Sequence, residues 1–380
     1  MTDKLKNVEK AAQRLRDAVK EKEEIVLYGD ADLDGSASLV ILKETLESLG
    51  AQIREVYFPD RGEEGYGLNI GALDYLQGKI EGKFILILLD LGITSFKEIK
   101  EAQERDIEVI IIDHHQPLEE VPQASLIVDP KQKGDDYPFK NLANAGVTFK
   151  LAQEILGSDF NKQEKSFLEL TALATIADMM EQAEDNEVFI EQGLESLKKT
   201  ERVGLKVLKD LFKEEEGIRE ISQQMISLLN AGDIVDHKTV IYNLLIVSTK
   251  EEAQEIVADL MKKSEARQKK IALMVEEVEN SQEFSSPVIF KVGQDWDVPL
   301  LGTVASKISH KVKKPVFLVK KSDFSSRGAV RMPSGLNAVD VMNKYSELLE
   351  TFGGHPPAAG FTIKNENIEK FKEKLINHFK

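Results

Sequence analysis

The stretch KFILILLDLG, from Lys83 to Gly92, decides the fold expected of this chain. Its consecutive apolar residues form a run of the kind found in strands that are buried on both faces of a parallel sheet. A second run, IEVIIIDHH from Ile107 to His115, has the same form. An aspartate follows each apolar run, so we expect two buried strands that each carry a carboxylate at the C-terminal end.

Strand-like and helix-like segments alternate around these two runs. The strand candidates are EIVLYGD (Glu24–Asp30), QIREVYF (Gln52–Phe58) and ASLIVDP (Ala124–Pro130). The segment SASLVILKETLESLG (Ser36–Gly50) has a helical pattern and ends at a glycine. This alternation predicts an α/β fold built on a doubly wound parallel sheet.

The second half of the sequence predicts two further parts. Residues 201–285 are mostly helical in pattern and end in one long helix that begins near EEAQEIVADLMKK. Beyond them, the strand-like segments PVIFKV, PVFLVKK and AGFTI alternate with helix-like segments, as expected of a smaller α/β domain. The prediction is therefore a first domain at residues 1–200, a helical connector at 201–285 and a second domain at 286–380.

The composition excludes several classes of protein. Hydrophobic residues make up 42% of the 380 residues and charged residues 31%, which is typical of a globular chain. No apolar run approaches the roughly 18 residues that a membrane span requires, and the charged N-terminal segment lacks the features of a signal peptide. Because there is no cysteine, disulfides, thiolate zinc sites and cysteine nucleophiles are excluded. We expect a cytoplasmic protein that is not associated with a membrane.

Charge is unevenly distributed along the chain. The net charge of −16 by itself argues against a nucleic-acid partner. However, residues 286–380 contain 15 Lys and Arg against 9 Asp and Glu, whereas the rest of the chain contains 35 against 57. The net charge of the whole chain therefore hides a basic second domain, and a polyanionic partner stays compatible with that domain.

Acidic residues recur where the predicted strands end. The stretch YGDADLDGSAS, from Tyr28 to Ser38, places three aspartates two residues apart, and alternate residues of an extended segment project to the same side. In open α/β sheets, the edge formed by the carboxyl ends of the strands is where ligands bind. The residues expected at this edge are Asp30, Asp32, Asp34, Asp90, Asp113, His114 and His115. Carboxylates gathered in this way repel one another unless a cation lies among them.

Aspartates and histidines without thiolates form a ligand set that suits Mn²⁺ or Mg²⁺, and suits Zn²⁺ less. Two such ions roughly 3.5–4 Å apart, bridged by a carboxylate, can activate water and neutralise a phosphoryl group. Asp90 follows a buried strand between the other clusters in sequence, so it is the candidate for the bridge. Asp178, within the apolar segment TIADMM, is a further candidate, because a carboxylate there is costly unless it is paired or metal-bound.

Each of these residues also has a structural explanation. An aspartate after a strand is often a turn former or a helix N-cap, which is an option for Asp34, and Asp178 is an option for a helix cap. Asp113 by itself could orient an imidazole, and the two histidines by themselves could lie at the surface. Several such explanations would have to coincide on one sheet edge, so the sequence favours a metal site.

Two stretches of the second domain predict contacts with phosphate. GGHPPAAG (Gly353–Gly360) has paired glycines, which let the backbone approach a ligand closely, and His355 follows them. RGAVRMPSG contains Arg327 and Arg331, and arginine is suited to bidentate contacts with phosphate. The alternative is a Gly-Gly turn with a surface histidine and two solvated arginines.

These motifs together resemble those of a known family. DADLDG, DLG, IDHH and TIADMM resemble, in order, the four motifs of the DHH phosphoesterase superfamily, and FGGHPPAAGFTI resembles the signature of the DHH-associated C-terminal domain. LLNAGDIVDHKTVIYNLLI, LMKKSEARQKKIALMVEE and RGAVRMPSGLNAVDVM resemble regions of RecJ-like single-strand exonucleases, the last of them an Arg-containing substrate loop. The resemblance covers nearly the whole chain, and its compact extent is similar to that of archaeal-type members.

The resemblance implies a role for each motif residue. The ligands of two Mn²⁺ or Mg²⁺ ions would be Asp30, Asp32, Asp34, Asp90, His114 and Asp178, with Asp90 as the bridge. Asp113 would support His114, and His115 would face the scissile phosphate, so Asp90, Asp113 and His115 form the expected catalytic set. The expected substrate-binding residues are Asn230, Arg327, Arg331, Gly353, Gly354 and His355.

Two positions depart from the pattern of the family. Tyr28 stands where many members outside the RecJ group have a metal-binding histidine, so the ligand role passes to Asp30. The family's NAAGR reads NAGD here, which replaces an arginine that could contact phosphate with Asp233. The expected function is a metal-dependent exonuclease that degrades single-stranded DNA or RNA to nucleotides in repair or replication. Replisome or repair proteins are the candidate protein partners.

Two other functions stay open at this point. One is a phosphodiesterase for nano-RNA, cyclic dinucleotides or phospho-adenosine phosphate, which the acidic balance of the chain favours. The other is a non-catalytic replication scaffold of the Cdc45 type, against which the intact set of Asp and His residues argues.

Overall fold

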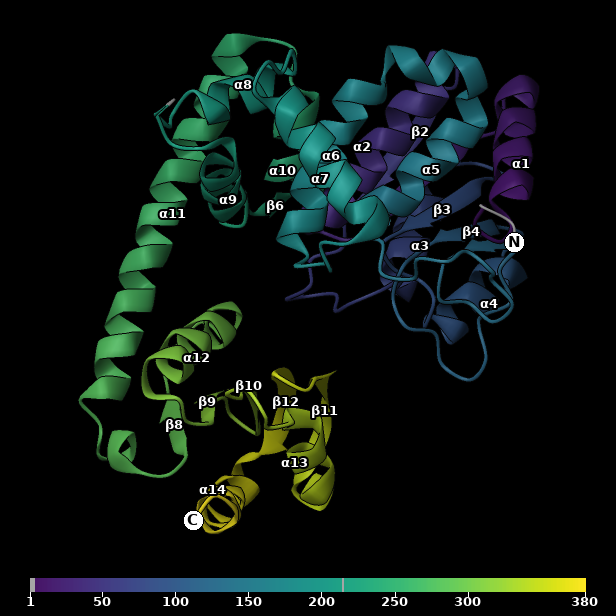
Figure 1. Cartoon of the computed structure of the whole chain (residues 1–380). Helices are drawn as coiled ribbons and strands as arrows, with labels where there is room; N and C mark the ends of the chain where they lie inside the picture. Colours follow the sequence, from purple (N-terminus) through teal and green to yellow (C-terminus); the bar gives the residue numbers. More distant parts are fainter. Residues whose placement is uncertain (1–3, 214) are drawn as a thin grey trace. The chain divides into compact units, whose positions relative to one another are not determined.

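The computed structural model describes residues 4–213 and 215–380, which belong to two compact units, Met1–Ser264 and Glu265–Lys380 (Figure 1). The long helix α11 (Lys250–Glu279) crosses the boundary between the units. Its last turns pack into the core of the second unit through Ile271, Met274 and Val278, which is why that unit begins well before its first strand. Within the described residues, no helix is both long and apolar enough to cross a membrane.

The first unit is built on a five-stranded parallel sheet. Its strands are β1 (Ile25–Gly29), β2 (Ile53–Tyr57), β3 (Ile85–Leu89), β4 (Glu108–Ile112) and β5 (Leu126–Val128), in the order β2-β1-β3-β4-β5. The chain leaves β1 toward β2 on one side and then crosses to β3 on the other side, so the topological switch lies between β1 and β3. This arrangement confirms the predicted α/β fold with a doubly wound parallel sheet.

Helices cover both faces of this sheet, as Figure 1 shows. One face packs against α1 (Val8–Glu21), α2 (Leu33–Ser48) and α5 (Asn144–Leu156), and the other packs against α3 (Ile70–Lys79) and α4 (Phe96–Glu104). Ile85, Ile87 and Leu89 point into the first core, whereas Leu86 and Leu88 point into the second. Because both faces of β3 are buried, its sequence is a continuous apolar run and not an alternating one.

A helical region follows the sheet in the first unit. Its elements are η1 (Gly157–Lys162), α6 (Glu164–Ala177), α7 (Glu184–Leu197), α8 (Val203–Lys209), α9 (Ile218–Leu229), the hairpin β6–β7 (Ile234–Val235 and Lys238–Thr239) and α10 (Val240–Ile246). Phe167, Leu170 and Leu173 of α6 share the core of α2 and α5. This packing places the C-terminal end of α6, where Asp178 lies, at the acidic edge of the sheet.

The second unit contains a mixed five-stranded sheet in the order β11-β12-β10-β9-β8. Its elements are η2 (Gln282–Ser285), β8 (Ile289–Gly293), α12 (Val298–Val312), β9 (Val316–Lys320), β10 (Ser325–Arg331), α13 (Ala338–Lys344), η3 (Ser346–Leu348), β11 (Leu349–His355), β12 (Ala358–Lys364), η4 (Asn365–Asn367) and α14 (Ile368–His378). Among its described strand pairs, β8 and β9 are parallel neighbours and the others are antiparallel. Residues of α13 and α14 cover one face, and those of α12 and α11 cover the other.

Two strands of this sheet do not have the apolar pattern of a strand. The RGAVR segment, which resembles a substrate loop, forms most of β10, and the paired glycines Gly353 and Gly354 lie within β11 and not in a turn. The ring of Phe361 lies directly over Gly328 of β10, where an added Cβ would come within 2.2 Å of it. One large side chain on β12 therefore fills the space that an apolar residue of β10 would otherwise occupy.

Candidate metal centre

The ends of the central strands are aligned, and this alignment creates the centre. Gly29 pairs with Leu89, and Leu89 pairs with Ile112, so Asp30, Asp90 and Asp113 follow equivalent positions on β1, β3 and β4. The ladder continues one residue further, because Asp30 N–H donates to Leu89 O and Asp90 N–H donates to Ile112 O. All three aspartates are buried, with Asp113 fully inaccessible. Parallel pairing alone thus gathers three carboxylates at the switch point.

The turn from β1 into α2 brings in two more carboxylates. Asp32 is the N-cap of α2, and its side chain accepts a hydrogen bond of 3.1 Å from Gly35 N–H. Gly35 is required here because an added Cβ would lie 2.2 Å from the carbonyl oxygen of Asp30. Its φ lies outside the left-handed region, so close approach and not backbone freedom explains the glycine.

Asp34 is held by a different helix from the one it belongs to. Its buried carboxylate accepts hydrogen bonds of 2.7 Å from the backbone N–H groups of Asn144 and Ala145, in the first turn of α5. The N-terminus of a helix stabilises negative charge, so α5 helps to hold this carboxylate in the centre. Burial and the nearby carboxylates of Asp178 and Asp32 nevertheless raise the pKa of Asp34 well above its usual value.

His114 presents an unprotonated nitrogen to a group of carboxylates. Its Nδ1 lies 2.8 Å from the carbonyl oxygen of Leu142, which can only accept, so Nδ1 carries the proton and Nε2 carries a lone pair. That Nε2 lies 3.2 Å from Asp90 Oδ1, 3.7 Å from Asp178 Oδ2 and 3.8 Å from Asp34 Oδ2. Burial, together with the charge of His115, lowers the pKa of His114 to about 4, so the ring is neutral at pH 7.

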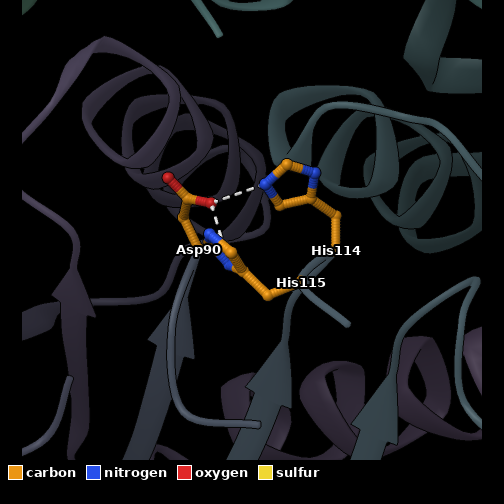
Figure 2. Close-up of side chains that lie close together, drawn as sticks. All are labelled: Asp90, His114 and His115. Atoms are coloured by element: carbon orange, nitrogen blue, oxygen red, sulfur yellow. Dashed lines mark ion pairs between the residues drawn. The ribbon is translucent and has the colours of Figure 1, made fainter. Parts of the chain in front are cut away.

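The donor set around His114 fits a divalent cation. A lone pair that faces ionised carboxylate oxygens has no hydrogen to share with them, and a divalent cation satisfies all of these atoms together. Within the described residues no group donates a hydrogen bond to the buried Asp90 Oδ1, so its lone pairs are free to bind a metal ion. Figure 2 shows this oxygen of Asp90 between the rings of His114 and His115.

Three groups of residues place ligand atoms within 4.8 Å of one another. They are Asp30, Asp32 and Asp90; Asp34, His114 and Asp178; and Asp90, His114 and His115. The first two groups could each hold one ion, and Asp90 stands between them because it also approaches His114. Its backbone φ is +66°, in the left-handed region that aspartate tolerates better than most residues.

Asp113 and His115 form a second pair within the centre. The Asp113 carboxylate accepts hydrogen bonds from the backbone N–H groups of Ile93, His114 and His115, and lies 2.8 Å from His115 Nδ1. Burial would raise the pKa of Asp113, but the hydrogen bond and charge of His115 outweigh it and lower the pKa. Burial would lower the pKa of His115, but Asp113 outweighs it and raises the pKa to about 9. His115 is therefore a partly exposed imidazolium at pH 7.

Three residues near the centre were not predicted from the sequence. Arg61, from the loop after β2, donates hydrogen bonds to Asp30 and Asp32. Lys131 Nζ donates to the carbonyl oxygen of His114 at 2.5 Å. Asp129 follows β5 and is fully buried, and burial raises its pKa to about 7. All three follow strands of the same sheet, so the rule that located the aspartates could have located them as well.

Tyr28 has a structural place beside the centre. Its buried ring stacks on Tyr57 with the centroids 5.1 Å apart, and its hydroxyl lies 3.1 Å from the carbonyl oxygen of Gly67. Asn69 Nδ2 donates to the same hydroxyl. Tyr28 thus fixes the loop after β2, while the neighbouring carboxylate of Asp30 belongs to a ligand group.

The predicted substrate-binding residues lie in both units. Arg327 and Arg331 share one face of β10. The guanidinium of Arg331 lies against Gly302 of α12, and Arg331 Nη1 donates to Val330 O at 2.9 Å. Gly353 and Gly354 lie in β11 beside His355, whose side chain is outside the described part of the structure. Asn230, by contrast, is the C-cap of α9 in the first unit. Their roles stay predictions.

The sequence matches two family models. Residues 24–175 match the N-terminal domain of the DHH family, and residues 285–380 match the DHHA1 domain. The chain is 34% identical over 381 residues to the single-stranded-DNA-specific exonuclease RecJ of Bacillus subtilis, an alignment that covers 98% of this chain and 47% of that protein. The chain thus spans about half the length of this curated relative.

Two solved structures are similar to the whole chain. A structure of exonuclease RecJ bound to manganese has a TM-score of 0.82 and 26% identity, and covers 100% of this chain and 96% of its own. RecJ from Thermus thermophilus in complex with Mn²⁺ has a TM-score of 0.84 and 26% identity, and covers 99% of this chain and 55% of its own. With both domain matches in the expected order and a shared fold, this chain contains a DHH-type N-terminal domain followed by a DHHA1 domain.

Proposed function

We propose that this protein is a divalent-metal-dependent exonuclease that hydrolyses phosphodiester bonds of single-stranded DNA or RNA to nucleotides. The observation that carries the proposal is the lone pair of His114 and the unpartnered oxygen of Asp90, which face each other among buried carboxylates. The similarity to exonuclease RecJ, solved with manganese, supports Mn²⁺ or Mg²⁺ as the ion and a nucleic-acid strand as the substrate.

The two ligand groups would hold the two ions. Asp30, Asp32 and Asp90 would hold one, and Asp34, His114 and Asp178 would hold the other. When bound, such ions lower the pKa of a water molecule and neutralise charge on a phosphoryl group. Asp90 would contribute to both positions, which keeps them at a fixed separation on the rigid end of β3.

His115 is suited to contact the scissile phosphate. Without a bound ion, Asp113 raises the pKa of the His115 ring to about 9, and the ring is 55% exposed, whereas the ring of His114 is neutral and buried. An imidazolium N–H directed at a phosphate oxygen stabilises the negative charge that develops during hydrolysis. Asp113 would hold this ring in place and keep it protonated, so we assign Asp113 a positioning role and not a metal-ligand role.

The second unit would bind the strand outside the cleavage site. Residues 286–380 carry an excess of basic residues, and Arg327 and Arg331 share one face of its sheet. In the register of β10, β12 and β11, Ala329, Gly360 and Gly353 form a row of small residues next to Arg331. Such a row leaves room for a sugar–phosphate backbone beside the arginine. Within the cell, repair and replication proteins are the expected partners of such an activity.

The nano-RNA phosphodiesterase alternative rests on one observation. Asp233 replaces the arginine of the family's NAAGR pattern, and it forms an ion pair of 2.8 Å with Lys263, which also pairs with Asp259. An acidic residue at this place would weaken binding of a long polyanion more than binding of a short one. The complete ligand groups argue against a non-catalytic scaffold.

An assay with graded substrates tests the proposal. The protein is incubated with Mn²⁺ and with DNA and RNA single strands of increasing length, labelled at the 5′ or the 3′ end. Progressive shortening of long strands is expected, with duplexes of the same sequence resistant. Cleavage restricted to substrates of about two to five nucleotides would instead favour the nano-RNA alternative.

A further inference from the structure

Arg61 lies inside one of the two ligand groups. Its Nε donates to Asp30 Oδ1 at 2.7 Å, and its Nη2 donates both to Asp30 Oδ2 and to Asp32 Oδ2, the latter at 2.8 Å. Both carboxylates are members of the Asp30–Asp32–Asp90 group. The guanidinium therefore uses lone pairs that a metal ion at that position requires.

This contact is not an ordinary surface ion pair. The side chain of Asp30 is only 10% exposed and that of Arg61 is 31% exposed, and the guanidinium binds Asp30 through a two-bond fork. A buried carboxylate needs a compensating cation, and a forked arginine contact supplies one with fixed geometry. Burial would lower the pKa of Arg61, but the hydrogen bonds and charges of Asp30 and Asp32 outweigh it and raise the pKa.

The other ligand group has a different partner. Asp34 and Asp178 lie near the neutral ring of His114, and the backbone N–H groups of α5 hold Asp34. An ion that binds there meets a lone pair and carboxylates, whereas an ion that binds at Asp30 and Asp32 meets an arginine. An ion that enters the Asp30–Asp32 position therefore has to displace the guanidinium of Arg61, whereas an ion that enters the His114 position displaces no arginine.

The loop that carries Arg61 is held by contacts that do not involve its guanidinium. Asp60 N–H donates to Glu64 Oε2 and Gly62 N–H donates to Asp60 Oδ1, both at 2.7 Å. Tyr57 OH donates to Glu64 Oε1 at 2.6 Å. The side chain of Arg61 can consequently leave the carboxylates by rotation about its own bonds, while the backbone of the loop stays fixed.

We propose that Arg61 is an internal counter-ion that occupies the Asp30–Asp32 position in the metal-free protein and is displaced when a divalent ion binds there. The group of Asp34, His114 and Asp178 then fills first, and the group that contains Arg61 fills second with lower affinity. While it is bound to these carboxylates, the guanidinium already lies over the exposed ring of Tyr66, whose centroid is 5.0 Å from Arg61 Cζ, and this ring is the surface against which a displaced guanidinium would pack. The inference rests on the proposed metal site but not on the proposed nuclease activity.

Metal binding without substrate tests this proposal. Mn²⁺ is titrated calorimetrically into chelator-treated protein, for the wild type and for Arg61→Gln, Arg61→Lys and Arg54→Gln. The wild type is expected to show two binding steps, and R61Q is expected to tighten the weaker step by about tenfold, because no internal cation opposes it. R61K keeps the charge but loses the fork, so it is expected to lie between the two. R54Q removes a positive charge at an exposed position of β2 and is expected to match the wild type.

Thermal unfolding of the same proteins separates displacement from a simple effect of nearby charge. R61Q is expected to lower the Tm of the metal-free protein and to leave the Tm at saturating Mn²⁺ unchanged, because Arg61 compensates the carboxylates only when the ion is absent. An equal loss of Tm in both states would overturn the proposal, as would an R61K protein that binds Mn²⁺ like the wild type. If R61Q bound Mn²⁺ with the same affinity as the wild type, the proposed role of Arg61 would be overturned, but the proposed metal site would not. If the wild type itself bound no Mn²⁺, both the proposed metal site and the proposed role of Arg61 would be refuted.

Discussion

Gly35→Ala is a single-methyl change that tests whether the start of α2 has to touch the backbone of Asp30. A Cβ at position 35 would lie 2.2 Å from Asp30 O and 2.8 Å from both Asp30 C and Asp30 N. Ordinary van der Waals contact begins at 3.4 Å, so the two backbones would have to separate by about 1 Å. Unlike a flexible side chain, these backbone atoms cannot rotate away.

The cost of that separation has two parts. Forcing a methyl group into a closely packed place destabilises a protein by about 1–3 kcal/mol. Alanine is also the better helix former, by about 0.5–1 kcal/mol, so the measured loss understates the clash. The same shift moves Asp32 and Asp34 away from Asp90, and a displacement of this size is large compared with the tolerance of a metal site.

Gly78→Ala is the matched control. Gly78 lies in α3, and an added Cβ there meets no atom within 4 Å. Calorimetric unfolding of metal-free protein is expected to show a lower Tm for G35A, and an unchanged or higher Tm for G78A. Mn²⁺ titration is expected to show at least tenfold weaker binding by G35A only, on the order of the effects known for misplaced ligands. If G35A matched the wild type in both measurements, the close contact would not exist and the reasoning would be refuted.

Three further outcomes follow from the structure. Asp90→Asn should weaken Mn²⁺ binding by at least about 100-fold and raise the Tm of the metal-free protein, because it removes a buried carboxyl group that lies among other carboxylates and whose Oδ1 meets no hydrogen-bond donor in the described residues; a lower metal-free Tm would contradict this. Glu55 pairs with Lys238 and Lys79, and although burial opposes it, these partners lower the pKa of Glu55. The ionised Glu55 contributes about 1 kcal/mol to the free energy of unfolding above the usual pKa of a glutamate, and this contribution is lost as the pH falls through the lowered pKa. In urea titrations, Glu55→Gln should therefore be less stable than the wild type at pH 7 and equal to it in acid. Arg331→Ala should weaken binding of a single strand and reduce the salt slope of its Kd by about one phosphate contact, and an unchanged slope would remove Arg331 from the binding face.

Much of the centre could be predicted from the sequence because of one geometric rule. The C-terminal ends of parallel strands lie side by side, so the residues after three apolar runs had to meet at one edge, wherever the helices packed. The apolar runs around Leu88 and Ile111 could be recognised because both faces of their strands are buried. Strands β10 and β11 could not be recognised in this way, since small and charged residues make up much of their sequence.

The sequence by itself determined the doubly wound sheet and the residues of its acidic edge, because periodicity and strand direction are local properties of the chain. Only the tertiary structure decided what each residue does there. The Asp34 carboxylate is held by α5, which lies about 110 residues further along the chain. Asp30 is bound by Arg61, which comes from the loop that follows β2 in the sequence. His114 and His115 are adjacent in sequence, yet one is neutral and the other charged. That difference comes from the contact of one ring with Leu142 O and of the other with Asp113, and such partners are set by packing and not by sequence order.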